Sequence, residues 1–196
     1  AFAQASSGDI GTALNPIRVE VPTPNLGNFT ADNVFVDFGS SDVFVNTPIN
    51  LTGDGNGYSA VTAGQIAINA TVSTTGNNAG IVLDSGSTVT VNAALSTTGG
   101  SSSINIDAVD DVTIAEALMA TGAGSQIDID SGGNVSFTAN GDLTADAGIT
   151  VTADAGLSGL YGLTMDAGLT FDAGGGPITL YSGSDMTLGS LTTTSF

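Results

Sequence analysis

Large apolar residues recur along the chain with a fixed 23-residue spacing. One column of such positions consists of Val43, Ile66, Val89, Val112 and Val135. A second column lies two positions further on and consists of Val45, Ile68, Val91, Ile114 and Phe137. A constant offset of this size, kept over five repeats, indicates a repeat protein in which each unit stacks on the next one.

Each repeat contains further apolar positions that alternate with polar ones. A third column with the same spacing consists of Ile49, Val72, Leu95 and Leu118. A fourth set consists of the pairs Ile81/Leu83, Ile104/Ile106 and Ile127/Ile129. This alternation predicts two or three short β-strands per repeat, each with one buried face, joined by turns rich in Gly, Ser, Asn and Asp. No segment shows a helical period.

These strands predict an all-β fold, a parallel β-helix (β-solenoid) with about 20–23 residues per coil, because stacked coils bury the apolar faces continuously. We expect a single domain over residues 1–196, with regular 23-residue coils over 43–145 and less regular, shorter coils over 146–196. Prolines interrupt residues 13–31, which predicts an edge or loop excursion there. The main alternative is a β-sandwich, which does not require a fixed offset.

Polar residues also keep the 23-residue spacing. The Asn column consists of Asn46, Asn69 and Asn92, and the Thr column of Thr52, Thr75, Thr98, Thr121 and Thr144. The Gly column, Gly53, Gly76, Gly99 and Gly122, directly follows four of these threonines. Amides one coil apart lie about 4.8 Å from each other, so we expect the Asn column to form a hydrogen-bonded ladder. We expect Gly and Asn to occupy the turns that need a positive φ.

One acidic column is a candidate metal site. Asp84, Asp107 and Asp130 are in register, and carboxylates at that separation repel each other unless they are solvated, protonated or bridged by a cation. Calcium prefers such oxygen ligands, so the Asp column predicts a possible Ca²⁺ site. The alternative is that these residues are solvated turn aspartates with no cofactor.

The composition excludes several functions. Asp and Glu number 19 against one basic residue, Arg18, for a net charge of −18, so nucleic-acid binding is not expected. His, Cys and Lys are absent, which removes Cys/His nucleophiles, Ser/His/Asp triads, Schiff bases and the usual zinc sites. No apolar run is long enough to span a bilayer, so we expect no membrane insertion. The opening Ala1-Phe2-Ala3-Gln4-Ala5 is similar to a signal-peptidase site, which favours export.

Residues 8–21, Gly-Asp-Ile-Gly-Thr-Ala-Leu-Asn-Pro-Ile-Arg-Val-Glu-Val, resemble a recurring segment of large bacterial exoproteins of the filamentous haemagglutinin type. Coils rich in Thr, Asn, Gly and Ala, such as residues 149–156, resemble that family in composition. The resemblance implies a right-handed parallel β-helix, export across the outer membrane, and a role in adhesion or as an extended surface fibre.

These observations predict a non-catalytic, extracellular structural protein of a bacterial surface, either an adhesin segment or a fibre or matrix subunit. Neither end shows a polar cap, so we expect that the chains either belong to a longer polypeptide or stack head to tail through their ends, with a host or surface glycan or protein as a further partner. A first alternative is a β-helical carbohydrate-active enzyme or glycan-binding module. It would use the carboxylates of Asp107, Asp110, Asp111, Asp128 and Asp130. A second alternative is an ice-binding solenoid that uses the Thr column.

Overall fold

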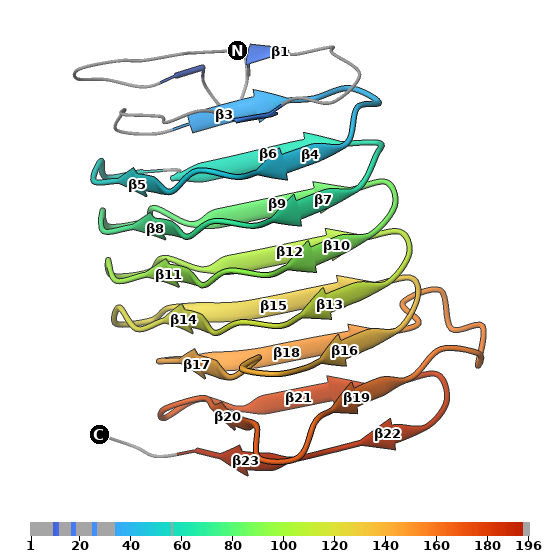
Figure 1. The fold of residues 1–196 in the computed structure, drawn as a ribbon. Helices are drawn as coiled ribbons and strands as arrows, with labels where there is room; N and C mark the ends of the chain where they lie inside the picture. The colour runs from blue at the N-terminus through green and yellow to red at the C-terminus, as the bar shows by residue number, and fades with distance from the viewer. Residues whose placement is uncertain (1–9, 12–16, 19–24, 27–33, 56, 194–196) are drawn as a thin grey trace.

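The computed structural model describes residues 10–11, 17–18, 25–26, 34–55 and 57–193. In this part of the chain all regular structure is β-strand and there is no helix. The strands form three parallel sheets that are wound into a β-solenoid of about seven turns, one strand of each sheet per turn (Figure 1). The predicted fold class is therefore confirmed.

Each sheet contains one strand from each successive coil. Strands that are neighbours in a sheet therefore come from consecutive coils. The first sheet contains β1 (Ile17–Arg18), β3 (Val34–Asp37), β6 (Tyr58–Thr62), β9 (Ile81–Ser85), β12 (Ile104–Ala108), β15 (Gln126–Ser131), β18 (Gly148–Ala153) and β21 (Ile178–Tyr181). The second contains β2 (Asn25–Leu26), β4 (Val43–Val45), β7 (Ile66–Ile68), β10 (Val89–Val91), β13 (Val112–Ile114), β16 (Val135–Phe137), β19 (Leu163–Met165) and β22 (Met186–Thr187). The third contains β5 (Ile49–Leu51), β8 (Val72–Thr74), β11 (Leu95–Thr97), β14 (Leu118–Ala120), β17 (Leu143–Ala145), β20 (Thr170–Asp172) and β23 (Ser190–Thr192).

The apolar columns form the core in the register that the spacing predicts. Val43 pairs with Ile66, and the same file continues through Val89 and Val112 to Val135. All five side chains are buried. Because the file lies inside the solenoid, each side chain packs on its equivalent one coil away, and the apolar surface is removed from water without a break. The β-sandwich alternative is wrong, since the strand pairs are parallel and one coil apart.

Hydroxyl side chains inside the bends satisfy buried backbone groups. The Ser102 hydroxyl donates to the Gly76 carbonyl at 3.0 Å and accepts from the Ala79 amide at 3.0 Å. Ser125, one coil on, repeats the arrangement, donating to the Gly99 carbonyl and accepting from the Ser102 amide. These serines join neighbouring coils at a place where an apolar side chain would leave amides without partners.

The Gly column serves close packing rather than positive φ. A Cβ atom on Gly76, Gly99 or Gly122 would overlap the carbonyl group of the glycine one coil earlier. The positive φ angles lie two positions beyond this column, at Gly55, Asn78, Ser101 and Gly124, with values of 121°, 53°, 54° and 76°. Gly and Asn therefore occupy turns with a positive φ, as expected, at Gly55, Asn78 and Gly124, but the Gly column itself has another role.

The last coils are longer than expected. Val135 pairs with Leu163 and Ile149 pairs with Ile178, so both of these coils exceed the regular 23-residue repeat. The extra length lies in the bends, above all in residues 154–162 between β18 and β19, which protrude from one side of the solenoid (Figure 1). The prediction of shorter coils holds only at the end, where Phe171 pairs with Leu191.

The N-terminal predictions fall mainly outside the described residues. Within 13–31 the structure describes β1 and β2, which pair in parallel with β3 and β4. The rest of this predicted excursion, the opening Ala1–Ala5 and most of the segment 8–21 lie outside the described part of the chain.

Candidate functional site

The Asp column lies on the outer face of the first sheet. Asp84 on β9 pairs with Asp107 on β12, which pairs with Asp130 on β15. All three side chains are exposed. The in-register residues on either side are Val61 on β6 and Thr152 on β18. The column is therefore a row of three carboxylates in the middle of the solenoid, as the spacing predicts.

Two aspartates of this surface, Asp107 and Asp128, have a raised pKa. Partial burial, and then the charges of Asp84 and Asp130, raise the pKa of Asp107. Partial burial, and then the charges of Asp130 and Asp107, raise the pKa of Asp128, which lies two positions before Asp130 on the same strand. Partial burial and like charges one strand apart both disfavour the ionised form, so Asp107 and Asp128 take up protons more readily than isolated carboxylates do.

The other acidic residues of the predicted cluster do not join this row. Asp110 and Asp111 lie in the bend between β12 and β13, where they bond to neighbouring coils. The Asp110 carboxylate accepts from the Ser87 hydroxyl at 3.2 Å, and the Asp111 carboxylate accepts from the Asn134 amide at 2.7 Å. In the described part of the chain, no three acidic side chains converge closely enough to hold a metal ion. Calcium binding to the Asp column stays a prediction.

The Asn column forms the predicted ladder. The Asn69 side-chain amide donates to the Asn46 side-chain oxygen at 2.9 Å, and Asn92 donates to Asn69 at the same distance. The Thr column is exposed from Thr52 to Thr121, but Thr144 does not belong to it. Thr144 pairs with Met119, because the bend between β16 and β17 is longer than the equivalent bend one coil earlier.

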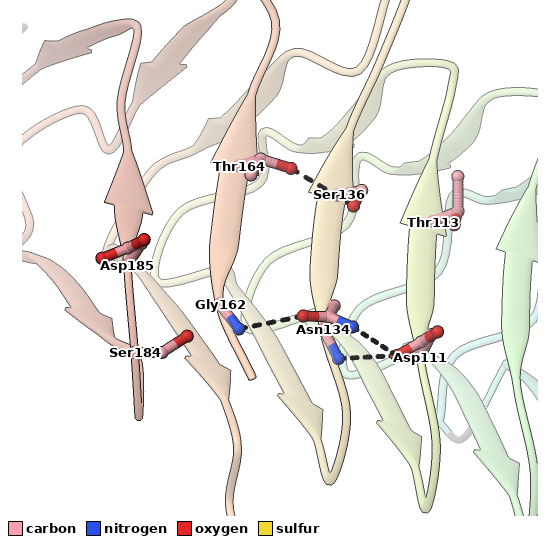
Figure 2. Close-up of a pocket in the computed structure, with 8 residues that line it drawn as sticks. All are labelled: Asp111, Thr113, Asn134, Ser136, Gly162, Thr164, Ser184 and Asp185. Carbon is pink, nitrogen blue, oxygen red and sulfur yellow. Dashed lines mark hydrogen bonds between the residues drawn. The ribbon is translucent and has the colours of Figure 1, made fainter. Parts of the chain in front are cut away.

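A polar groove crosses the outer surface of the second sheet near the C-terminal coils. A first hollow of about 330 Å³ is lined by side chains from four successive coils, as Figure 2 shows. These residues are Asp111, Thr113, Asn134, Ser136, Gly162, Thr164, Ser184 and Asp185. Hydrogen bonds hold part of the floor in place. Asn134 donates to Asp111 and accepts from the Gly162 amide at 3.0 Å, and Thr164 donates to Ser136 at 3.2 Å (Figure 2).

A second hollow of about 350 Å³ adjoins the first and shares Asp111 and Asn134 with it. Its other lining residues are Thr88, Val109, Asp110, Gly132, Gly133 and Tyr161. Tyr161 contributes an aromatic side chain to the wall, and 37% of this residue's surface is exposed. We refer to the two adjoining hollows together as the bend groove.

Tyr161 belongs to the long bend 154–162, which is held by an internal network. Asp154 is buried, and its carboxylate accepts from Ser158 Oγ at 2.7 Å, from the Ser158 amide at 3.0 Å and from the Gly159 amide at 2.6 Å. Burial by itself raises the pKa of Asp154, but the hydrogen bonds from Ser158, Gly159 and Leu160 outweigh it and hold this pKa below its usual range.

The same bend is tied to the coils on both sides. The Asp154 amide donates to the Gly133 carbonyl at 3.0 Å, and the Tyr161 carbonyl accepts from the Ser184 amide at 3.0 Å. The bend nevertheless leaves two large apolar side chains in solvent, Leu157 with 85% and Leu160 with 73% of its surface exposed. An anchored segment that presents apolar side chains beside a polar groove has the features of a recognition surface.

In the part of the chain that the structure describes, no further coil stacks on the coil formed by β21, β22 and β23. Leu191 on β23 continues the buried file of Leu95, Leu118, Leu143 and Phe171, yet 43% of its surface is exposed. Further large side chains exposed in this coil are Tyr181, Met186 and Leu188. The backbone of β21, β22 and β23 pairs on one side only, which leaves three parallel strand edges open.

The sequence did not indicate the bend groove. Some of its lining residues keep the 23-residue spacing, as Asp111 and Asn134 do, but the 154–162 insertion breaks the spacing before Gly162 and Thr164. The available signal was the apolar and aromatic group Leu157, Leu160 and Tyr161 within a polar, glycine-rich stretch.

No family model, curated protein or solved structure shows a significant match to the chain. The β-solenoid of about seven turns is compatible with a β-helical adhesin, and this agreement is one of fold. In the described part of the chain no helix has the length and hydrophobicity to cross a membrane.

Proposed function

We propose that the protein is a non-catalytic structural component of an extracellular bacterial surface, an adhesin segment or fibre subunit whose solenoids stack end to end. The observation that carries the proposal is the open last coil. Its inward positions hold Ile178, Leu180, Met186 and Leu191, which are core residues by register but are only partly covered.

The occupant that fits this end is a further coil of the same kind, from a second copy of the solenoid or from a continuation of the same chain. Three parallel strand edges in a three-sided arrangement can all be paired only by another coil with the same outline. Among the described strands the opposite ends of the three sheets are β1, β2 and β5, and a head-to-tail contact that reaches these strands would continue each sheet. Such a contact does not close on itself and therefore produces a filament.

Local charge also favours stacking. Edge strands are commonly protected from association by charged side chains, especially lysine. Between Ile178 and Thr193 the only charged residue is Asp185, although the chain as a whole carries a net charge of −18. Repulsion between chains therefore acts mainly along the sides of the solenoid and least at this end.

The composition of the chain and its expected resistance to proteases also support an external location. The chain has one site for trypsin, after Arg18, and strands paired on both sides resist proteases in general. Together with the resemblance of residues 8–21 to filamentous haemagglutinin-type exoproteins, this supports a surface-exposed role.

Sedimentation velocity and electron microscopy of the purified chain over a range of concentrations test the proposal. We expect oligomers that lengthen with concentration and appear as rods of one width. Leu191→Asp should suppress them by placing a charge on the open coil. Met119→Asp is the matched control, because Met119 is similarly exposed, at 40%, but lies on the side of the solenoid. A monomer at every concentration, or equal loss of assembly in both variants, contradicts the proposal.

A further inference from the structure

The bend groove has the features of a ligand site that is separate from the ends of the solenoid. We propose that it binds a linear oligosaccharide without acidic groups. The inference goes beyond the proposed stacking and does not depend on it, because the groove lies on the side of the solenoid and is complete within one chain.

The first argument is the periodic arrangement of polar groups. Thr113, Ser136 and Thr164 are register partners on β13, β16 and β19, so their backbone positions repeat at about the 4.8 Å spacing of the strands, and each of them carries a hydroxyl group. A hydroxyl can donate and accept, as can the hydroxyls of a sugar. Since successive units of an extended glycan repeat over a comparable length, a linear chain along the groove meets an equivalent group at each coil.

The second argument is the aromatic side chain of Tyr161, which an anchored segment of backbone carries. Sugar rings have apolar faces of C–H groups that pack on aromatic rings, and a backbone that is already held in place need not be ordered on binding. Tyr161 lines the groove, and its backbone is held by the Ser184 amide. Val109, also in the wall, is 63% exposed and adds apolar surface beside the ring.

The third argument is charge, which selects the class of glycan. The groove contains the carboxylates of Asp110, Asp111 and Asp185. None of its lining residues is basic, and the whole chain has a single basic residue. A polyanionic glycan is therefore repelled, whereas the hydroxyl groups of an uncharged glycan can donate hydrogen bonds to the carboxylates. The volumes of the two hollows are within the range of small-ligand sites.

Calorimetric titration of the full chain, at a concentration where it is monomeric, tests the inference. The probes are an uncharged N-acetylglucosamine hexamer, a glucose hexamer linked as in cellulose, and oligogalacturonate as the acidic probe. We expect at least one uncharged hexamer to bind with a dissociation constant in the range of about 0.1–1 mM, and oligogalacturonate to bind at least about tenfold more weakly.

Tyr161→Ala should weaken binding of the uncharged hexamer by about tenfold, and Tyr161→Phe should retain it, because the ring remains. Tyr181→Ala is the matched control, since Tyr181 is an exposed tyrosine of the last coil that does not line the groove. Lack of binding by both uncharged hexamers, tighter binding of oligogalacturonate, or equal weakening in the Tyr161→Ala and Tyr181→Ala variants overturns the inference. A negative result in this titration does not bear on the proposed stacking, because stacking is measured without glycan.

Discussion

The coils from β6 to β14 and the coils from β18 to β23 are built on the same three sheets but differ in every bend. In the first region the register partners keep the 23-residue spacing, and polar columns run along the surface. In the second the spacing changes from one pair of partners to the next, and the polar columns stop. The inward files nevertheless continue, since Ile149 still pairs with Ile178. The core constrains the strands, and the bends are free to vary.

This difference separates two roles along one solenoid. Identical bends bring equivalent residues into line, which produces the Asn ladder and the Gly column and stiffens the rod. Bends of unequal length interrupt these columns but change the local shape of the surface, as the 154–162 insertion does beside the bend groove. We therefore expect substitutions in the regular bends to affect stability, and substitutions in the long bend to affect binding.

The largest expected effect that tests this comparison is at the Gly column. In Gly99→Ala the new Cβ meets the backbone of Gly76, which the strand pairing fixes in place. We expect a loss of about 4 kcal/mol in the free energy of unfolding, somewhat above the usual cost of overpacking because no side chain can move aside. Gly156→Ala in the long bend is the control, since nothing lies within 4 Å of its Cβ position, and its stability should change by less than about 0.5 kcal/mol.

Urea denaturation followed by circular dichroism measures both variants. Equal losses for Gly99→Ala and Gly156→Ala would show that the regular and long bends are constrained alike. The comparison above would then be wrong.

The second test uses one file of the core. Leu95 is fully buried in the regular region, and Leu191 occupies the same file in the open last coil. We expect Leu95→Ala to cost about 3 kcal/mol, because it leaves a cavity. Leu191→Ala should cost about 1 kcal/mol or less, because water already reaches this side chain.

Denaturation at two protein concentrations separates folding from stacking. At low concentration the two costs should differ as stated. At high concentration the cost of Leu191→Ala should rise if another coil covers Leu191, whereas the cost of Leu95→Ala should stay constant. Equal costs for the two variants at low concentration would mean that the last coil is not open in the monomer.

The regular region was the part that the sequence could predict. A stacked coil requires an apolar residue at each inward position, so the file of Val43, Ile66, Val89 and Val112 is visible as a spacing. The Asn ladder follows from the same register. Where bends change length, counting along the chain fails. Thr144 keeps the 23-residue spacing from Thr121, but Leu143, not Gly141, is the partner of Leu118.

The role of the Gly column and the bend groove could not be read from the sequence for another reason. A glycine that allows close approach and a glycine with a positive φ look the same as letters, and only the contact between Gly99 and the Gly76 carbonyl distinguishes them. The groove depends on side chains from four coils that meet across unequal bends. The Asp column was found from its spacing, but its acidity depends on how far water reaches it.

A smaller gain in stability is expected at Tyr58 in β6. This side chain is fully buried, and its hydroxyl has no hydrogen-bond partner in the described part of the chain. Tyr58→Phe removes the unpaired hydroxyl and keeps the ring, so we expect the free energy of unfolding to increase by about 1 kcal/mol. Tyr181→Phe in the open last coil, where the side chain is exposed, should change it by less than about 0.3 kcal/mol. A loss of stability in Tyr58→Phe would show that this hydroxyl does have a partner.

The smallest expected effect concerns the Asp column of the regular coils. Partial burial and the charges of Asp84 and Asp130 raise the pKa of Asp107 in the folded protein. Between the ordinary carboxyl pKa and this raised one the folded state binds more protons than the unfolded state, so stability falls as the pH rises through that interval. Asp107→Asn should therefore stabilise the protein at pH 7, by about 0.5 kcal/mol, and the gain should vanish near pH 3, where the carboxyl is protonated in both states.

The free energies of unfolding of the wild type and of Asp107→Asn are measured by denaturation at pH 3 and pH 7, with and without calcium. Asp54→Asn is the control, because the Asp54 carboxylate lies in a bend and accepts a hydrogen bond from the Asn77 amide at 2.7 Å, so its replacement should not stabilise the protein. If the Asp column binds calcium, the ion should stabilise the wild type at pH 7 and have a smaller effect on Asp107→Asn, which has lost one ligand. If calcium changes the stability of both proteins equally, the carboxylates of the Asp column are solvated and do not bind the ion. If Asp107→Asn is less stable than the wild type at pH 7, the repulsion between these carboxylates is already relieved in the wild type.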